Sequence, residues 1–359
     1  MKIPRILVLG AGGPAGTNFI KSLRMSKTKY YIVGADMNEY HLMLPPIDKG
    51  VILPHALHMD YEDKLIEIIK IYDIDFVHAQ PDIEVQKLGA IHNHILSKTG
   101  AKTFLPNIDA ITLCRNKLKC YYRLKNNDVP VPLSFPVDDI SRLPEEFEKL
   151  MVKQRPEYPP DSVWVRAITG AGSRASMRVH NAEQLLNWVF YWINYKKMDL
   201  KEFMMSEYLP GREFAWQSLW FNGKLITSQA RERMEYYMGN LSVTGQSSSP
   251  SVARTVHNES VNIVGTRAVQ AVDKKATGIF CVDMKENARD MYPCVTEINA
   301  GRFFTTSNFF STLGCNMPDI YVQMGLNNKP PTGLKQYDPL PENIYWIRQP
   351  DSEPIYMLR

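Results

Sequence analysis

Three residues with oxygen-bearing side chains, Asp283, Glu297 and Asn299, lie in two apolar segments of the C-terminal third. We expect the segments to be neighbouring strands joined by the polar turn Lys285–Asp290. Glu297 and Asn299 then project from one face, because side chains alternate along a strand. Hard oxygen donors on one face are what Mg²⁺ requires when it bridges two phosphates. They could merely cap a turn, but among apolar strand residues they are costly to bury without a cation.

A glycine-rich loop and two cations could hold those phosphates. The strand Val163–Arg166 runs directly into Thr169-Gly170-Ala171-Gly172-Ser173-Arg174. Backbone amides in such a loop can cap phosphates, while Arg166 supplies a fixed bidentate donor. Lys117 precedes the extended segment Val129–Pro132, at an expected domain junction where a cation could reach a phosphate. Taken alone, a lysine in this position is more often simply solvated.

A strand and turn in the middle of the chain could bind a nucleoside. Met204-Met205-Ser206-Glu207-Tyr208-Leu209 is followed by Pro210-Gly211 and by a second strand with Glu213 just inside it. The backbone around Glu207 and Leu209 can face an adenine edge, while the Glu213 carboxylate accepts from ribose hydroxyls. The alternative is a surface hairpin with two ordinary glutamates.

The N-terminal glycine loop Gly10–Gly16 is ambiguous. It follows a strand and precedes a helix, so its amides can hold an anion. Asp36 ends the second strand, where a dinucleotide-binding fold places its ribose-binding acid. However, the last position of the dinucleotide motif is occupied by alanine, which makes a poor match. The loop therefore either binds a phosphate or only allows close packing of strand and helix.

Alternating strands and amphipathic helices in the first hundred residues predict a parallel sheet with crossover helices. We expect the N-terminal strands at Ile6–Leu9, Tyr31–Ala35, Phe76–Ala79 and Thr103–Leu105 and a helix over Asp60–Tyr72. Later β-rich runs at Phe214–Phe221, Lys224–Thr227 and Ile344–Arg348 suggest antiparallel pairing, the last as an edge strand. Met238–Ser251, rich in Gly, Ser and Thr, is predicted to be a loop that could close over a site.

Composition excludes several classes of protein. The 359 residues carry 42 basic and 38 acidic side chains, and this mild excess suits small anions better than nucleic acid. Five cysteines without a CxxC spacing predict neither a disulfide framework nor a zinc ribbon, and favour the reducing cytoplasm. No stretch is apolar enough for a signal peptide or a membrane span.

In this order, the segments resemble the ATP-grasp superfamily, and within it the carbamoyl-phosphate-synthetase-like and carboxylate-amine ligase branch, over nearly the whole chain. Arg166 stands where many members have lysine and the carbamoyl-phosphate enzymes have arginine. Glu297-Ile298-Asn299 is similar to the family's Glu-x-Asn metal motif, with Asp283 at the position of the other metal ligand. Where the family often reads Asn-Pro-Arg, this chain reads Asn299-Ala300-Gly301-Arg302, which shifts the arginine by one residue.

The resemblance implies a role for each group of residues. The phosphates would be bound by Lys117, Arg166, Thr169, Gly170, Gly172 and Ser173. The hinge that binds adenine would be Glu207, Tyr208 and Leu209, with Glu213 on the ribose, and the metal ligands would be Asp283, Glu297 and Asn299. The catalytic arginines that face the reaction centre would be Arg231, Arg233 and Arg302.

The implied fold class is α/β (α+β): a Rossmann-like pre-ATP-grasp domain followed by a two-lobed ATP-grasp fold. The expected divisions are 1–112 for the first domain, 113–205 for the small lobe (roughly 130–205 for its A subdomain), 206–328 for the large lobe and 329–359 for a tail. The implied enzyme uses ATP and Mg²⁺, or Mn²⁺, to activate a carboxylate or carbamate-like substrate for an amine, and is a homodimer. The alternatives are a non-catalytic ATP-binding module and an NAD-dependent oxidoreductase.

Overall fold

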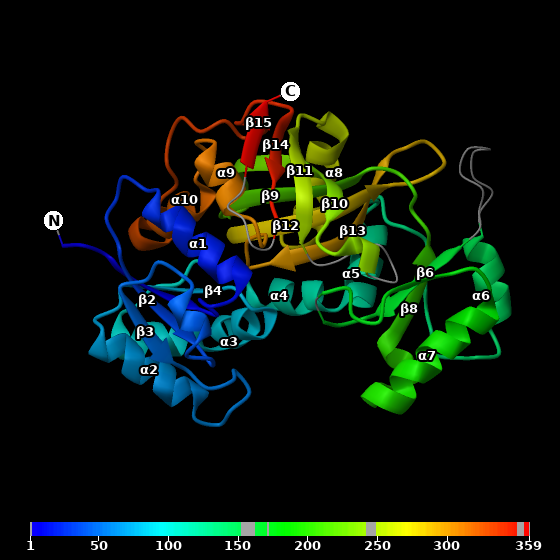
Figure 1. The fold of residues 1–359 in the computed structure, drawn as a ribbon, viewed down its shortest axis with the longest axis horizontal. Helices are drawn as coiled ribbons and strands as arrows, with labels where there is room; N and C mark the ends of the chain where they lie inside the picture. The colour runs from blue at the N-terminus through cyan, green and yellow to red at the C-terminus, as the bar shows by residue number, and fades with distance from the viewer. Residues whose placement is uncertain (1, 152–161, 171, 242–248, 350–354, 359) are drawn as a thin grey trace.

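The computed structural model describes residues 2–151, 162–170, 172–241, 249–349 and 355–358. These residues form three sheets with flanking helices (Figure 1). The N-terminal unit lies at one end of the molecule and the smallest lobe at the other, with the largest sheet between them (Figure 1). Within the described residues, no helix is both long enough and apolar enough to cross a membrane.

The N-terminal unit is built on a four-stranded parallel sheet of order β3-β2-β1-β4. Its strands are β1 Arg5–Leu9, β2 Tyr31–Asp36, β3 Lys49–Ile52 and β4 Phe76–Ala79. Its helices are α1 Pro14–Arg24, α2 Tyr61–Ile71 and α3 Asp82–Thr99, with a 3₁₀ turn at His41–Met43.

Two strand predictions for this unit differ from the structure. Strand β3 was not predicted, because this largely exposed edge strand lacks the apolar run that marks the buried strands. The strand predicted at Thr103–Leu105 does not form; instead Lys102 makes an isolated parallel bridge to Phe76. The predicted helix over Asp60–Tyr72 is confirmed as α2.

The smallest lobe is an antiparallel sheet of order β5-β8-β6-β7, covered by two helices that share its separate hydrophobic core. Its strands are β5 Ser134–Pro136, β6 Val163–Ala167, β7 Met177–Val179 and β8 Phe203–Glu207. Its helices are α6 Leu143–Leu150 and α7 Ala182–Lys196, with a 3₁₀ turn at Leu200–Glu202.

The largest sheet has seven antiparallel strands in the order β13-β12-β9-β10-β11-β14-β15. Its strands are β9 Glu213–Phe221, β10 Lys224–Tyr236, β11 Pro250–Val256, β12 Gly278–Glu286, β13 Pro293–Ala300, β14 Ile344–Ile347 and β15 Ile355–Leu358. The accompanying helices are α8 Glu259–Val272, α9 Asn308–Thr312 and α10 Met317–Asn327, with a 3₁₀ turn at Gly239–Leu241.

Three features of this sheet extend or correct the sequence predictions. Strand β10 continues nine residues beyond the predicted Lys224–Thr227, so Arg231 and Arg233 lie within a strand. Strand β14 is not the edge, because β15 pairs with its outer side. The centre of the predicted loop Met238–Ser251, residues 242–248, lies outside the described residues.

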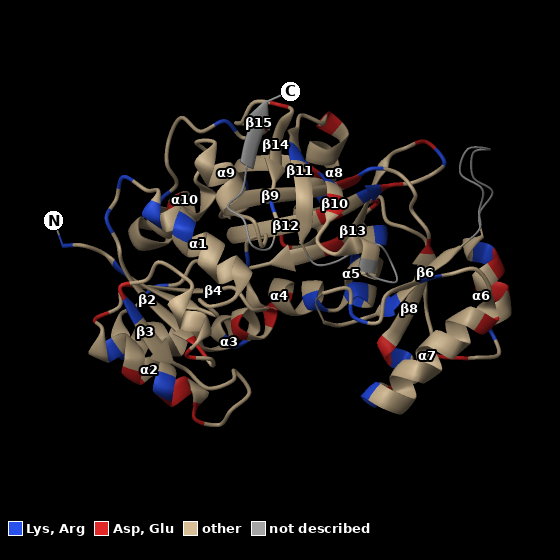
Figure 2. Cartoon of the chain, viewed as in Figure 1, with Lys and Arg blue, Asp and Glu red and all other residues tan. Residues whose placement is uncertain are grey.

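Two short helices, α4 Ile108–Arg115 and α5 Lys117–Lys125, join the units. Asn116 separates them and caps α5, since its side chain accepts from the Lys119 amide. Both helices pack on β13 and α8, and one continuous core runs from the N-terminal sheet through them to the largest sheet. Both basic and acidic side chains occur on outer helices such as α2 and α6 (Figure 2).

Candidate functional site

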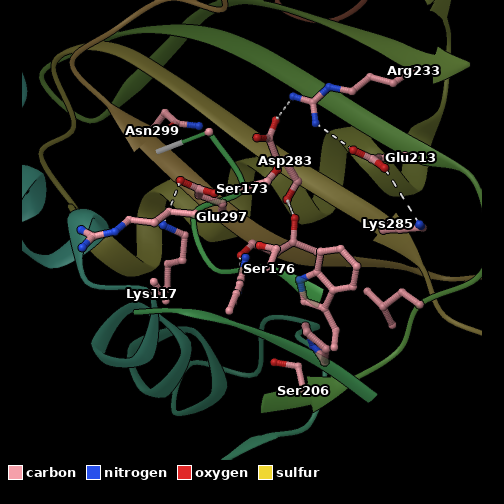
Figure 3. Close-up of a pocket in the computed structure, with 18 of the residues that line it drawn as sticks. Lys117, Ser173, Ser176, Ser206, Glu213, Arg233, Asp283, Lys285, Glu297 and Asn299 are labelled. Atoms are coloured by element: carbon pink, nitrogen blue, oxygen red, sulfur yellow. Dashed lines mark hydrogen bonds and ion pairs between the residues drawn. The ribbon is translucent and has the colours of Figure 1, made fainter. Parts of the chain in front are cut away.

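A cavity of about 540 Å³ lies where the small sheet faces the largest one. All but one of the residues predicted for the site line it: Lys117, Arg166, Gly170, Gly172, Ser173, Glu207, Tyr208, Leu209, Glu213, Arg231, Arg233, Asp283, Glu297, Asn299 and Arg302. Thr169 does not line the cavity and is exposed to solvent. Segments more than a hundred residues apart in sequence therefore meet at one place (Figure 3).

The predicted metal ligands come from two adjacent strands. Asp283 on β12 is directly opposite Glu297 on β13, and Cys281 is opposite Asn299. Burial raises the pKa of the Asp283 carboxyl, and the neighbouring Arg233 offsets only part of that increase. Burial also acts to raise the pKa of Glu297, but Lys117, Arg166 and Arg302 together outweigh it and lower that pKa. The two facing carboxylates therefore have different proton affinities.

Cations balance this acidic centre. The Lys117 Nζ lies 3.4 Å from Glu297 Oε1, and the Arg233 Nη2 lies 2.6 Å from Asp283 Oδ1 (Figure 3). Arg302 donates to the Asn299 amide oxygen. Among the described residues, no cluster of three or more His, Cys, Asp and Glu side chains could hold a metal ion alone. Two carboxylates and an amide oxygen nevertheless fit Mg²⁺, which is typically held by one or two carboxylates together with phosphate oxygens.

The backbone after β13 explains how the shifted arginine reaches the site. Gly301 has φ +92°, and a Cβ there would lie 2.6 Å from Val85 Cγ1. This left-handed residue turns the chain, so that Arg302 folds back onto Asn299. The Arg302 Nε donates to Asp82, the first residue of α3. The extra residue relative to the family pattern is thus accommodated by a glycine turn.

The glycine-rich loop has an unusual backbone. Gly170, Gly172 and Ser173 have φ of +102°, +71° and +55°, respectively. The Lys117 Nζ donates to the Gly170 carbonyl oxygen at 2.7 Å, which ties α5 to the start of the loop. Turns that contain residues with positive φ can point neighbouring backbone N–H groups toward one concave side, an arrangement that suits an anion.

Arg166 connects the two sheets. Its Nη2 donates to the Thr296 carbonyl oxygen on β13 at 2.7 Å, while its buried Nε has no hydrogen-bond partner. Burial lowers the pKa of Arg166, although Glu297 acts in the opposite direction. The guanidinium can therefore still donate a hydrogen bond to a ligand at the cavity wall.

The predicted adenine hinge links the two sheets between β8 and β9. The Glu207 carboxylate is 3% exposed and receives two bonds from Arg289, at 2.6 and 2.9 Å, so its side chain is already engaged. Two cations lie over the Tyr208 ring, with the Arg178 guanidinium 4.2 Å and the Lys285 Nζ 5.4 Å from its centroid. A nucleobase at this hinge would thus meet the backbone and the Tyr208 ring rather than the Glu207 carboxylate.

Glu213, predicted to bind ribose, belongs to a network of side chains. Its carboxylate lies 2.9 Å from Arg233 Nη1 and 3.9 Å from Lys285 Nζ, and it accepts from the Tyr236 hydroxyl (Figure 3). Arg233 bridges Glu213 and Asp283, so the expected ribose site and metal site share one cation.

Arg231 differs from Arg233 in having no acidic partner among the described residues. It is 2% exposed, donates to the Thr306 hydroxyl and stacks 4.6 Å from the Phe304 centroid, while its Nε has no hydrogen-bond partner. Burial, together with Arg233 and Arg348, lowers the pKa of Arg231 to about 9. A buried cation without a direct ion pair is unfavourable, so the site is suited to an anionic ligand at this end.

Several residues at the cavity were given no individual role from the sequence. They include Pro132, Trp164, Ala167, Arg174, Ser176, Ser206, Tyr236, Lys285, Thr296, Phe304 and Thr305, all of which line it. Strand alternation could have found Lys285, which lies two residues after Asp283 on the same strand face. Asp82 and Arg289 gave no signal, because their partners are 220 and 82 residues away in sequence.

The N-terminal glycine loop is not among the residues that line this cavity. A Cβ on Gly16 would lie 2.2 Å from the Gly10 carbonyl oxygen, so this glycine permits the close approach of strand and helix. The Asp36 carboxylate accepts from the Gly12 amide at 3.1 Å. The acid that a dinucleotide site would place on ribose is therefore used within the loop.

No protein-family model and no curated protein sequence matches the chain, but solved structures do. L-amino acid ligase from Bacillus licheniformis superposes with a TM-score of 0.65 at 13% identity, covering 96% of this chain and 79% of that one. Biotin carboxylase from Campylobacter jejuni superposes with a TM-score of 0.69 at 13% identity, covering 96% of this chain and 75% of that one. N5-carboxyaminoimidazole synthetase from Staphylococcus aureus superposes with a TM-score of 0.65 at 14% identity, covering 96% of this chain and 82% of that one. The parallel N-terminal sheet, the two antiparallel lobes and these neighbours show that the chain has the ATP-grasp fold.

Proposed function

We propose that the protein is an ATP-dependent, ADP-forming carboxylate-amine ligase that requires Mg²⁺ or Mn²⁺. The observation that carries this proposal is the opposition of Asp283 and Glu297 across β12 and β13, with Asn299 on the same strand face as Glu297. These oxygen donors share one cavity with the glycine-rich loop and with Lys117, Arg166 and Arg302. Such an arrangement suits a metal-bound polyphosphate better than any other common ligand.

In the proposed reaction, an oxygen of the substrate carboxylate attacks the γ-phosphorus of ATP, and the bond to the bridging oxygen breaks to release ADP. The amine then attacks the acyl carbon, phosphate leaves, and a C–N bond forms. Mg²⁺ held by Asp283, Glu297 and Asn299 would neutralise phosphate charge. No protein nucleophile is required, so the side chains act through position and charge.

The described contacts support distinct roles for the cations. Lys117 and Arg166 flank the glycine-rich loop and suit the phosphates. Arg302 lies beside Asn299 and suits the transferred group. Arg233 orients Asp283, whereas Arg231 has no acidic partner in the described part of the chain and suits the substrate carboxylate.

The nucleotide is further supported by fold relatives solved with it. The biotin carboxylase domain of 2-oxoglutarate carboxylase from Hydrogenobacter thermophilus was solved as a dimer with MgADP, and the Staphylococcus aureus synthetase was solved with ADP. We extend nucleotide binding and a homodimer to this chain as proposals. A cytoplasmic location is also proposed, because all five cysteines are unpaired and buried.

The test is Mg²⁺-dependent release of ADP and phosphate from ATP in the presence of pooled amino acids and small carboxylates. Hydroxylamine added to the reaction should trap the acyl phosphate as a hydroxamate. Glu297→Gln should abolish both signals. A matched control is Glu235→Gln, which alters an exposed glutamate on β10 that does not line the cavity.

Each outcome is decisive for the proposal. Stimulation by one pool, lost in Glu297→Gln but kept in Glu235→Gln, supports the ligase and begins to identify its substrate. ATP binding without consumption under every pool favours a non-catalytic module. Absence of ATP binding to the wild-type protein contradicts the proposal.

A further inference from the structure

The indole of Trp188 holds the far end of the glycine-rich loop. Trp188 lies on α7, and its Nε1 donates to the Ala175 carbonyl oxygen at 2.9 Å. The two cavity-lining residues that flank Ala175 are Arg174 and Ser176. The Trp188 side chain therefore reaches the loop without being among the residues that line the cavity.

Ala175 has a backbone conformation that requires support. Its φ is +53°, and its side chain is buried in the small-lobe core at 1% exposure. A non-glycine residue persists in the left-handed region only where its surroundings fix it. A buried carbonyl oxygen also needs a donor, because leaving it unpaired is costly. The Trp188 N–H meets both needs.

The loop is thus fastened at both ends by side chains from different helices. At the start, Lys117 of α5 donates to Gly170 at 2.7 Å, and at the end, Trp188 of α7 donates to Ala175. Backbone bonds from Ala167 N to Arg174 O and from Ser176 N to Ser173 O close the turn between them. Displacing either end would redirect the amides between Gly172 and Ser176.

The indole packs within a row of aromatic rings on α7. Tyr191 stacks on Trp188 with centroids 6.0 Å apart and an interplanar angle of 12°, and Trp192 meets Trp188 edge-on at 6.0 Å. Tyr191 is nevertheless 48% exposed, so this row is not part of a fully buried core. Trp188 therefore packs on its own helix and also donates to the loop.

We propose that Trp188 is a positioning residue for nucleotide phosphates, acting through the Ala175 carbonyl and the glycine-rich loop. This inference rests on the proposed ATP-dependent function. It predicts that loss of the indole N–H weakens binding of ligands that carry phosphates and spares ligands that carry only the nucleoside.

The test compares Trp188→Phe with Trp192→Phe. The control is matched because Trp192 lies one helical turn further along the same helix, and its buried Nε1 has no hydrogen-bond partner. Calorimetric titration of each protein with MgADP and with adenosine gives the two affinities. Trp188→Phe should bind MgADP about threefold to tenfold more weakly, as expected for one lost hydrogen bond. Its affinity for adenosine, and both affinities of Trp192→Phe, should match the wild type.

Hydrogen exchange gives a second, local readout. Trp188→Phe should accelerate exchange of the Ser176 amide, which bonds to Ser173 within the loop, while amides in the largest sheet are unchanged. If Trp188→Phe folds poorly, replacing Trp188 by benzothienylalanine keeps the ring size and removes only the N–H donor.

The possible results separate the two proposals. Equal MgADP affinity in the wild type and the N–H-deficient protein overturns the role of Trp188 alone. Equal weakening of MgADP and adenosine shows a general structural role and also overturns it. Failure of the wild-type protein to bind MgADP or ATP contradicts the proposed function itself.

Discussion

Asp283 and Glu297 face each other across β12 and β13, yet their surroundings shift the two pKa values in opposite directions. Glu297 is surrounded by Lys117, Arg166 and Arg302, which favour its charged form. Asp283 is held mainly by Arg233, which does not fully offset the effect of burial. The pair therefore combines a carboxylate whose charged form is favoured with one whose charge is more readily lost.

This asymmetry predicts the effect of Asp283→Asn. The substitution removes one anionic ligand and leaves the Arg233 guanidinium with Glu213 as its remaining carboxylate partner. We expect Mn²⁺ affinity in the presence of ADP to fall by about tenfold to a hundredfold, by analogy with the loss of groups around other metal sites. Electron paramagnetic resonance of free Mn²⁺ measures this without relying on turnover. Unchanged affinity would exclude Asp283 as a metal ligand.

Replacing Arg231 should have opposite effects on substrate affinity and on stability. Arg231→Met removes a buried cation that has no acidic partner among the described residues, so the thermal midpoint should rise. The KM for the carboxylate substrate should increase about a hundredfold, since a charge-assisted contact of about 3 kcal/mol is lost. The KM for ATP should change little.

The Arg231→Lys variant is the control for charge in that experiment. It should recover part of the substrate affinity, because the positive charge is kept while the planar guanidinium is lost. Thermal denaturation and steady-state kinetics of the three proteins test the prediction. A large increase in the KM for ATP would instead assign Arg231 to the nucleotide.

Glu84 predicts a pH dependence of stability. Burial raises the pKa of this α3 carboxyl from 4.5 to about 7, and its Oε2 has no hydrogen-bond partner. The folded state therefore binds the proton more tightly than the unfolded chain, so the free energy of unfolding falls as pH rises from 4.5 to about 7. The total loss should be about 2 to 3 kcal/mol, and it is complete above that window.

Glu84→Gln keeps the shape of the protonated carboxyl and cannot ionise. It should be as stable as the wild type at pH 4.5 and more stable at pH 8, as measured by urea unfolding at several pH values. The difference between the two proteins isolates this group from all other titrations. A constant difference across the whole range would contradict the assignment.

Gly301 predicts a combined defect in folding and activity. Gly301→Ala places a Cβ 2.6 Å from Val85 Cγ1 at φ +92° and should cost about 1 to 3 kcal/mol of stability. Because this turn brings Arg302 to Asn299, turnover should fall at temperatures where the variant remains folded. Gly333→Ala is the control, since Gly333 has φ +79° but no atom within 4 Å of the added Cβ. Equal activity in both variants would show that the placement of Arg302 does not depend on the glycine turn.

The sequence was informative where the polar side chains of the site lie within recognisable apolar strands. Alternation predicted that Glu297 and Asn299 share a strand face, with Asp283 on the neighbouring segment, and the structure brings all three to one cavity. The edge strand β3 escaped prediction because its exposed residues carry no apolar pattern. The contact between Arg302 and Asp82 escaped because it depends on the packing of the N-terminal unit against the end of β13. Local patterns contain no information about such distant pairs.

The separate core of the small lobe affects how the molecule should unfold. The N-terminal unit and the largest sheet share one core, whereas β5 to β8, α6 and α7 enclose their own. Without a ligand, these two cores are expected to melt as separate calorimetric transitions, the small lobe first, because it buries less apolar surface. A nucleotide held between them would add its binding energy only when both are folded. Saturation with nucleotide should then merge the two transitions into one, making the ligand the element that turns two folding units into a single cooperative molecule.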